Sequence, residues 1–399
     1  MAESVHTARW IRQVGGRGWD THLFPVEDWG FHPELKEIAV HDLIDNRAPG
    51  LGPSIRRVDR CWPIWGAGWV LPKGAYRVWD LTKRWFPLSE KRAWRLARTI
   101  RKLRPDLIHS LEFQRGGYLA LESRRHLDGD FPPWIVSNWG SDIYLFGRLR
   151  DHIEKINAVL STCDYYACEC QRDVELARSF GFKGEVLPVL PNAGGYDIEW
   201  LRRLREPGDS SGRRLIVLKG HQNWAGRALV GLRAIELCAD VLRGYRVAVY
   251  SAAPEVEIAA ELLAQSTGLT IEIVRRCSHE DMLRLHGQAR VSIGLSISDA
   301  ISTSLLEAMI MGSFPIQSDT SCANEWVVCG ETAILVHPDD PRGVARALRR
   351  AVTDDALVDR AAEINAQVTA ERLDRSVIQP QVIATYEKIA AKGEKQRKA

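Results

Sequence analysis

The sequence lacks long hydrophobic runs. Nowhere in its 399 residues are there the roughly 18 consecutive apolar residues that a membrane-spanning helix requires. Its first residues, MAESVHTARWIRQ, also lack the apolar core of a secretory signal peptide. We therefore expect a protein that is not integral to a membrane.

Cysteine pairs of the CxxC type are missing as well. The eight cysteines are scattered, and Cys168 and Cys170 alternate within the strand-like stretch YYACEC. Alternation puts both side chains on one face of a strand, which favours buried thiols over a metal site. Free thiols are typical of a reducing compartment, so we expect a cytoplasmic protein.

What the sequence does contain is a repeated alternation of strand-like and helix-like segments. Short apolar stretches such as RLIVLKG, YRVAVYS and RVSIGLSIS are separated by patterns with apolar residues three and four apart, such as GRALVGLRAIELCADVL. This alternation predicts an α/β fold in which helices cover both faces of parallel sheets. The length of the chain predicts two domains.

A stretch that contains proline, glycine and serine, LPNAGGYDIEWLRRLREPGDSSGRR, interrupts the alternation once. We assign residues 1–192 to a first domain, 193–213 to a linker, 214–375 to a second domain, and 376–399 to a crossover helix and basic tail. The first domain is unusual because VHTARWIRQVGGRGW, already typical of a helix, follows only about four residues. We therefore expect its opening strand to be missing, with that sheet position empty or filled by another segment.

Two acidic residues, Asp299 and Glu307, lie eight positions apart in SISDAISTSLLEAMIMGSFPIQSDT. The pattern predicts a strand, a loop that contains Asp299, and a helix that begins near Ser304. After a parallel strand, a helix N-terminus presents unpaired N–H groups to anions, so both acids would lie beside a phosphate site. The alternative is that Ser304 and Glu307 form a capping box that only closes the helix.

Several segments together resemble the family 4 retaining glycosyltransferases of the GT-B fold, over nearly the whole chain from VHTARW to VIQPQVIATYEKIA. DAISTSLLEAMIMGSFPIQS is similar to the family signature of two acids separated by seven residues. SCANEWVVCGETAILVHPDDPRGVARAL, KLRPDLIHSLEFQ, WIVSNWGSDIY and LPNAGGYD resemble further family segments. The resemblance implies two Rossmann-like, doubly wound domains that face a central cleft, and a C-terminal helix that returns to the first domain.

The resemblance also implies roles for residues of the second domain. Asp299 would bind hydroxyls of a donor sugar and Glu307 the ribose of its nucleotide, tasks that suit carboxylates because each accepts several hydroxyl bonds. The family often has Glu at the first position, so the donor sugar stays open. Glu325 matches a further acidic position. Backbone N–H groups at the helix start would bind the diphosphate; these donor-site residues are Ser302, Thr303, Ser304 and Leu305.

Two cations, Lys219 and Arg227 in LKGHQNWAGRAL, resemble the basic pair of the family with the order reversed. Lysine as a point charge and arginine as a bidentate donor both suit a phosphate, although either could be a solvated surface charge. No Asp-x-Asp metal motif occupies a suitable position. We therefore expect an enzyme that needs no metal or other cofactor, in which Lys219, Arg227 and the helix dipole stabilise the leaving nucleotide diphosphate.

The acceptor side would lie in the first domain, at the ends of DLIHSLE and WIVSNWGSD. Trp139 could stack on a sugar face or lie in the core. Asp142 could bind an acceptor hydroxyl or cap a helix over IYLFGRL. His109 faces the same cleft if DLIHSL is a central strand, although a histidine at a strand end is more often structural.

We expect transfer of a sugar from a nucleotide-diphospho-sugar to an acceptor hydroxyl with retention of configuration, as the resemblance implies. No convincing general base is found among the acids, which fits a reaction in which an oxygen of the leaving phosphate takes the proton. Two alternatives stay open. One is a nucleotide-sugar epimerase on the same fold, and the other is a non-catalytic carbohydrate-binding scaffold.

Residues 56–104 carry 14 lysines or arginines against three acids, and six of the 14 tryptophans. Aromatic rings among basic residues suit the headgroup layer of an anionic membrane, whereas the alternative is a tryptophan core beside a solvated helix. No nucleic-acid-binding module accompanies them, so we expect no nucleic-acid partner. We expect a basic, tryptophan-rich insertion over residues 45–104 that docks the enzyme peripherally at the inner face of the cytoplasmic membrane, near a glycan or lipid-linked acceptor.

Overall fold

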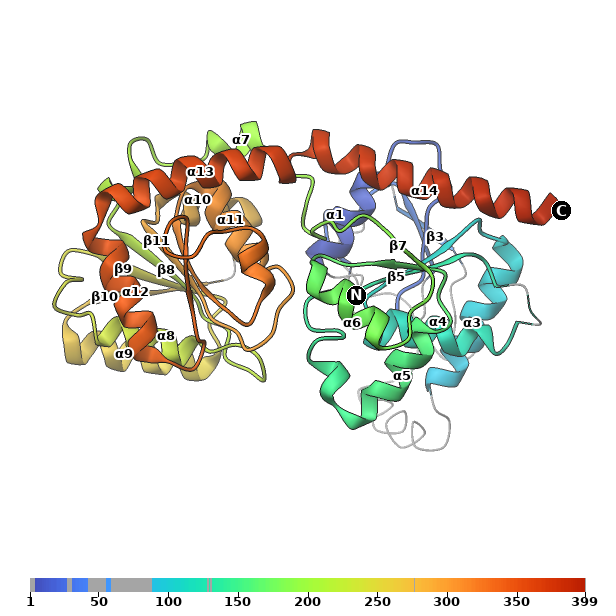
Figure 1. The fold of residues 1–399 in the computed structure, drawn as a ribbon, viewed down its shortest axis with the longest axis horizontal. Helices are drawn as coiled ribbons and strands as arrows, with labels where there is room; N and C mark the ends of the chain where they lie inside the picture. The colour runs from blue at the N-terminus through green and yellow to red at the C-terminus, as the bar shows by residue number, and fades with distance from the viewer. Residues whose placement is uncertain are drawn as a thin grey trace, which may run out of the picture. The chain divides into compact units, whose positions relative to one another are not determined.

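The computed structural model describes residues 4–26, 31–41, 55–58, 88–127, 129, 131–275 and 277–398. The chain divides into two compact units (Figure 1). Unit 1 comprises Met1–Ala193 and Gln379–Ala399, and unit 2 comprises Gly194–Ile378. In each unit helices flank parallel sheets, as the alternating pattern predicts. Within the described residues, no helix is long and apolar enough to cross a membrane.

Unit 2 is built on a parallel sheet of six strands in the order β10-β9-β8-β11-β12-β13. The strands are β8 Leu215–Lys219, β9 Arg246–Tyr250, β10 Thr270–Val274, β11 Val291–Gly294, β12 Phe314–Ser318 and β13 Ile334–Val336. The chain fills the sheet from β8 to β10 in one direction, then returns beside β8 and continues from β11 to β13 in the other. The order therefore reverses between β8 and β11, and in such sheets ligands bind beyond the carboxyl ends of the strands at this reversal.

Helices cover both faces of this sheet (Figure 1). They are α7 Ile198–Arg202, α8 Ala228–Glu236, α9 Pro254–Thr267, α10 His279–Gln288, α11 Thr303–Met311, α12 Pro341–Thr353 and α13 Asp355–Leu373, with short helices η3 Ser210–Gly212 and η4 Cys322–Glu325. In β8, Ile216 and Leu218 pack in the core beneath α8, α9 and α12, whereas Leu215 and Val217 pack toward α10. Both faces of the central strand are therefore buried, which explains its unbroken apolar sequence.

The segment expected as a linker, residues 193–213, contains α7 and η3 and belongs to unit 2 from Gly194 onward. The backbone N–H groups of Gly195 and Tyr196 both donate to the carbonyl of Leu373 at 3.1 Å. Tyr196 and Asp374 also form an isolated parallel bridge. Backbone pairing therefore ties this segment to the end of α13. Helix α14, Arg375–Lys398, follows, and from Gln379 it belongs to unit 1, as the expected crossover helix does.

Unit 1 contains a parallel sheet of four strands in the order β4-β5-β6-β7. Its strands are β4 Ile108–Leu111, β5 Trp134–Ser137, β6 Tyr165–Ala167 and β7 Glu185–Val186. Its helices are α3 Leu88–Leu103, η1 Phe113–Gly117, α4 Tyr118–Arg124, η2 Phe146–Arg148, α5 Arg150–Leu160 and α6 Gln171–Ser179. Trp134 and Val136 pack against α4, α5 and α6 on one face, and Ile135 packs against Ile389 of α14 on the other.

A second sheet of unit 1 has three parallel strands in the order β1-β2-β3. They are β1 His22–Leu23, β2 Ile38–His41 and β3 Ile55–Val58, and α1, Val5–Val14, packs on them through Ala8 and Ile11. The sequence pattern misses β2 and β3. Among the described strands, β1 and β4 each pair with one strand only, so the two sheets are separate. Of the expected basic insertion, residues 55–58 and 88–104 are described, and the rest lies outside the described residues.

Candidate functional site

The carboxyl ends of β8 and β11 bring together two of the predicted site segments. Lys219 is the last residue of β8, and Asp299 lies in the loop between β11 and α11. Lys219 is half-buried and lies opposite Tyr250 of β9 in the sheet register. In the described part of the chain, no carboxylate forms an ion pair with Lys219. Its positive charge is therefore available at the point where the strand order reverses.

Helix α11 follows β11, the strand that pairs with β8 in the sheet. Its N-cap is the buried Ser302, whose side chain makes no capping hydrogen bond. Ser304 lies inside the first turn, and its Oγ accepts a hydrogen bond from Tyr250 Oη at 2.8 Å. The capping-box alternative for Ser304 is therefore wrong, because Ser304 is helical and is not the N-cap. The N–H groups of this first turn and the positive end of the helix dipole suit an anion.

Glu307 is buried in the same helix, with 7% of its surface exposed. Its Oε1 lies 2.6 Å from His279 Nε2 and accepts a hydrogen bond from Tyr196 Oη at 3.2 Å. His279 is the first residue of α10, and Tyr196 precedes α7, so three separate elements meet at one carboxylate oxygen. The carboxylate is thus held in a defined orientation just beyond the first turn of α11.

A second histidine, His286 of α10, contributes to the electrostatics of this cluster. Its Nδ1 lies 2.9 Å from Ser292 Oγ, and its ring packs edge-to-face against Tyr250 with centroids 5.7 Å apart. Burial lowers the pKa of His286 to about 4; the positive charge of Lys219 acts in the same direction and Glu307 opposes it. His286 is therefore neutral near pH 7.

The loop that carries Asp299 is anchored on both sides. Asp299 Oδ1 accepts a hydrogen bond from the N–H of Ala300 at 2.9 Å, and the carbonyl of Ala300 accepts one from Cys322 N at 2.8 Å. On the other side, Ile297 N donates to the carbonyl of Ala225 in the β8–α8 loop at 3.0 Å. The loops after β8, β11 and β12 therefore form one connected layer beyond the sheet.

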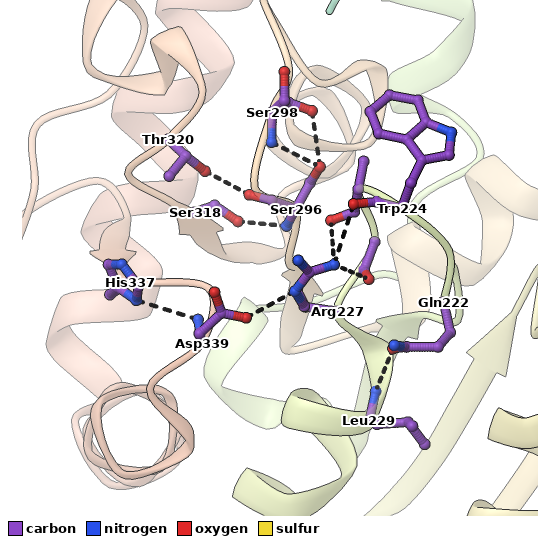
Figure 2. A network of polar contacts seen from close by, with 12 residues as sticks. Gln222, Trp224, Arg227, Leu229, Ser296, Ser298, Ser318, Thr320, His337 and Asp339 are labelled. Carbon is purple, nitrogen blue, oxygen red and sulfur yellow. Dashed lines mark hydrogen bonds and ion pairs between the residues drawn. The ribbon is translucent and has the colours of Figure 1, made fainter. Parts of the chain in front are cut away.

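Arg227, the N-cap of α8, lies within this layer (Figure 2). Its Nε donates to Asp339 Oδ1 at 2.7 Å, and its Nη1 donates to the carbonyls of Ala225 at 3.2 Å and Gly226 at 3.0 Å. Figure 2 shows the guanidinium between the β8–α8 loop and the segment after β13. Its side chain is 22% exposed. The observed contacts of Arg227 thus stabilise loops, and its binding to a phosphate stays a prediction.

Glu325 ends the short helix η4, which follows β12. Its carbonyl accepts a hydrogen bond from Arg372 Nη1 at 2.8 Å, and the guanidinium of Arg372 stacks 3.7 Å from the ring centroid of Trp326. These contacts attach η4 to α13. Glu325 therefore lies at the carboxyl edge of the same sheet, and its part in donor binding stays a prediction.

In unit 1, Asp142 joins the loops that follow β4 and β5. Its buried Oδ2 accepts hydrogen bonds from the backbone N–H groups of Phe113 at 3.0 Å and Trp139 at 2.9 Å. Residues 140–145 form turns that lead into η2, so the alternative of an α-helix over IYLFGRL capped by Asp142 is wrong. Trp139 is half-buried, and its Nε1 has no hydrogen-bond partner among the described residues.

Glu112, at the end of β4, forms a second buried carboxylate near Asp142. Its backbone φ is +86°, and its Oε1 accepts hydrogen bonds from the N–H groups of Arg115 at 2.6 Å and Gly116 at 2.8 Å. Burial raises the pKa of Glu112. Burial, followed by the negative charge of Glu112, also raises the pKa of Asp142. The two carboxylates shape the edge of the sheet where the predicted acceptor residue Trp139 lies.

His109 lies in an internal network of unit 1. Its Nδ1 is 2.5 Å from Tyr386 Oη of α14, its Nε2 is 2.7 Å from Ser137 Oγ of β5, and Trp10 of α1 donates to the same Tyr386 at 2.8 Å. Burial lowers the pKa of His109 to about 3. The network fits the structural alternative for His109, and its contact with an acceptor stays a prediction.

The sequence prediction misses the residues that surround Glu307. Tyr196, Tyr250, and the pair His279 and His286 of α10 come from three segments, and no local motif connects these segments. The SHED sequence at the start of α10 does form a capping box between Ser278 and Asp281, which fixes the start of that helix. That signal could locate His279 at a helix N-terminus, but its contact with Glu307 depends on the packing of α10 beside α11.

Two family models match parts of the sequence. Residues 254–368 match the family described as glycosyl transferases group 1, and residues 71–163 match the family described as glycosyl transferase 4-like. The first match includes β10 to β13 and therefore the loop with Asp299 and the helix with Glu307. No curated protein matches the sequence.

Solved structures share the fold at low sequence identity. Sucrose-phosphate synthase from Thermosynechococcus elongatus is 15% identical, with a TM-score of 0.69 over 97% of this chain and 93% of that chain. The trehalose 6-phosphate synthase from Burkholderia multivorans is 15% identical, with a TM-score of 0.61 over 81% of this chain and 78% of that chain. Alr3699/HepE from Anabaena, in complex with UDP and glucose, is 14% identical, with a TM-score of 0.58 over 77% of this chain and 83% of that chain.

These likenesses confirm the predicted fold class, because most of the chain matches GT-B structures with two α/β domains. The two family matches fall in different units, one in each half of the chain. Together with the shared fold, they support the place of this chain among the glycosyltransferases of the GT-B fold.

Proposed function

We propose that the protein transfers a sugar from a nucleotide-diphospho-sugar to an acceptor hydroxyl, and that unit 2 binds the donor. The observation that carries this proposal is the placement of Lys219 at the end of β8, and of α11 with Glu307 after the neighbouring strand β11, where the strand order reverses. Both charged side chains lie near His286. This arrangement supplies positive potential for a diphosphate and a carboxylate for hydroxyl groups. The family matches over both units point to the same chemistry.

In this proposal, each site residue binds a different part of the donor. The N–H groups of residues 302–304 and the ammonium of Lys219 bind the diphosphate, and Glu307 binds the ribose hydroxyls. The N–H of Leu305, also expected here, donates to the carbonyl of Ser302 at 3.0 Å. Asp299 binds hydroxyls of the sugar, and Glu325 completes the donor site from η4. Arg227 binds the diphosphate as a second cation only if its guanidinium turns away from Asp339, its present partner.

The proposed chemistry retains the configuration of the sugar and needs no metal. The acceptor oxygen forms a bond to the anomeric carbon on the face from which the nucleotide departs, and the bond from that carbon to the phosphate oxygen breaks. The proton of the acceptor passes to an oxygen of the leaving diphosphate. Lys219 and the α11 dipole stabilise the negative charge that develops on this leaving group.

Unit 1 is proposed to bind the acceptor, and α3 suggests that this acceptor is attached to an anionic membrane. Helix α3 buries Ala93, Ala97 and Ile100, while Trp94 is 52% exposed. Arg98 lies over the ring of Trp94 at 5.8 Å. Three further exposed cations follow within the next six residues: Arg101, Lys102 and Arg104. An exposed indole among cations suits a lipid headgroup layer, so we propose a peripheral enzyme with a lipid-linked or envelope glycan as acceptor.

A donor panel tests the central proposal. The protein is incubated with UDP-, GDP- and ADP-sugars, with and without lipid extract as acceptor, and nucleotide release and the sugar product are followed by NMR. We expect nucleotide release with one donor and an anomeric product of unchanged configuration. Epimerised donor without release would favour the epimerase alternative, and neither reaction, with sugar binding intact, would favour the scaffold alternative.

Substitution of Lys219 tests the observation on which the proposal rests. Lys219→Met keeps the length of the side chain and removes its charge, so we expect nucleoside diphosphate affinity to fall at least about tenfold while nucleoside affinity hardly changes. Lys183→Met, which removes an exposed lysine of unit 1, is the matched control. Equal diphosphate affinity in Lys219→Met and the control would contradict the proposed site.

A further inference from the structure

We propose that His279 and Tyr196 are positioning residues that orient Glu307 toward the two hydroxyls of a ribose, and that they thereby set the preference of the site for ribonucleotides. The inference rests on the proposed function, in which Glu307 binds the nucleotide. It concerns residues outside the acidic signature, since His279 lies 28 positions before Glu307 and Tyr196 lies 111 positions before it.

The geometry at one carboxylate oxygen carries this inference. His279 Nε2 lies 2.6 Å from Glu307 Oε1, and Tyr196 Oη donates to the same oxygen at 3.2 Å. Two donors from separate elements restrict the rotation of the carboxylate plane, which a glutamate on a solvent-exposed helix would sample freely. A carboxylate with a fixed plane can meet two neighbouring hydroxyl groups with both hydrogen-bond directions correct.

Both donors are themselves held by the backbone. Tyr196 is buried, its N–H donates to the carbonyl of Leu373, and its own carbonyl accepts from Arg375 N at 2.8 Å. His279 begins α10 directly after Ser278, whose Oγ accepts from Asp281 N at 3.1 Å in the capping box. The two side chains therefore start from fixed positions, so their hydrogen bonds restrain Glu307 instead of moving with it.

The position of His279 also suits a histidine as the hydrogen-bond donor to Glu307. The side chain reaches from the first turn of α10 to Glu307 of α11, and it is 31% exposed. In the neutral form Nε2–H donates to the carboxylate, and in the protonated form the same contact becomes charge-assisted. Glutamine can offer an N–H donor at similar reach, whereas leucine fills similar space without any donor. These two replacements separate hydrogen bonding from packing.

The experiment measures the affinity for UDP, GDP or ADP, whichever binds most tightly, and for its 2′-deoxy counterpart by calorimetric titration. The single variants are His279→Leu, His279→Gln, Tyr196→Phe and Glu307→Gln. Each of the first three is also made in the Glu307→Gln background. Tyr245→Phe, at a buried tyrosine of unit 2 outside the site, is the matched control. Thermal unfolding confirms that each variant is folded.

We expect His279→Leu and Tyr196→Phe each to lower ribonucleotide affinity about tenfold and to reduce the preference over the 2′-deoxynucleotide, while His279→Gln stays within about threefold of wild type. In the Glu307→Gln background the first two changes should have little further effect, because they act through Glu307. Full additivity in that background, or an unchanged deoxy preference in His279→Leu and Tyr196→Phe, would overturn the inference.

The failure of the proposed function gives a different result. If wild-type protein binds none of the three nucleotides, or if Glu307→Gln binds as tightly as wild type, the donor-site assignment itself is wrong and the inference falls with it. If Glu307→Gln weakens binding but His279→Leu and Tyr196→Phe bind like the Tyr245→Phe control, the donor site stands and only the positioning role is overturned.

Discussion

Arg227 Nε and Asp339 Oδ1 lie 2.7 Å apart and join the start of α8 to the segment that follows β13 (Figure 2). The same guanidinium donates to carbonyls of the β8–α8 loop, which itself pairs with the loop after β11 through Gly226 and Ser296. Ser296 in turn accepts from Thr320 Oγ1 at 2.5 Å. Arg227 thus joins two of the loops that surround the proposed donor site, and the contacts of Ser296 extend this connection to the loops after β11 and β12.

We predict that Arg227→Met lowers the free energy of unfolding by about 1–2 kcal/mol, because a half-buried guanidinium loses an ion pair and several carbonyl contacts. Asp339→Asn, which weakens only the ion pair, should have a smaller effect of the same sign. Urea titration measures both. An unchanged unfolding free energy in Arg227→Met would contradict the loop-stabilising role, and a selective loss of diphosphate over nucleoside affinity would favour a phosphate ligand.

Metal independence is a second prediction. Lys219 and the N-terminus of α11 supply positive potential at the proposed diphosphate site, so we expect donor turnover to continue in excess EDTA. The assay compares EDTA alone with EDTA plus an excess of Mg²⁺ or Mn²⁺, after prior dialysis against chelator. Loss of turnover in EDTA and its recovery with either ion would show that the phosphate-site assignment is incomplete.

A third prediction concerns acid stability. Burial lowers the pKa of His109 to about 3 from its ordinary value of 6.5, so the folded protein keeps this residue neutral where the unfolded chain binds a proton. Because the unfolded state binds more protons in this window, stability falls as the pH falls from about 6.5 toward 3. His286, with a pKa of about 4, acts with the same sign.

Replacing His109 by Gln should therefore reduce the slope of unfolding free energy against pH between about pH 6 and 4, by up to about 1.4 kcal/mol per pH unit. Chemical denaturation at several pH values measures this slope. His286 is present in both wild type and His109→Gln, so its contribution cancels when the two slopes are compared. His126→Gln, at an exposed histidine of unit 1, is the control. Equal slopes for wild type and His109→Gln would contradict the buried neutral histidine.

The sequence predicts the parts of the fold that depend on local pattern. The central strands of unit 2 are buried on both faces and are apolar runs, so RLIVLKG and RVSIGLSIS are identifiable without tertiary information. Strands β2 and β3 were missed because IRRV of β3 lies in a basic segment and IAVH of β2 is only four residues long. Their stability depends on α1, whose contacts the sequence does not reveal.

In the candidate site, too, some residues can be located from local sequence pattern and others only from the tertiary structure. Asp299, Glu307 and Lys219 follow strand ends, so their approximate location could be predicted from the sequence. The contact of Glu307 with Tyr196 joins residues 111 positions apart and depends on how the segment after Gly194 packs beside α11. Likewise, the partners of His109 on β5 and α14 lie 28 and 277 positions away. Such contacts are determined by the tertiary arrangement.

The last prediction concerns membrane docking through α3. We predict that the protein floats with liposomes that contain anionic lipid, and that binding weakens as salt shortens the screening length. Replacement of four exposed cations by Ser should reduce recovery strongly, since each basic residue near an anionic surface contributes about 1 kcal/mol. These cations are Arg98, Arg101, Lys102 and Arg104. Trp94→Ser should reduce it further by removing the exposed indole.

A charge-matched control separates this surface from net charge. It replaces four exposed arginines of unit 2 by Ser, namely Arg203, Arg243, Arg275 and Arg342, and so changes the charge of the protein by the same amount. We expect this control to float like wild type. Equal losses in both quadruple variants would assign binding to overall charge, equal recovery with neutral and anionic vesicles would remove the electrostatic argument, and no recovery with either would leave α3 as a solvated helix.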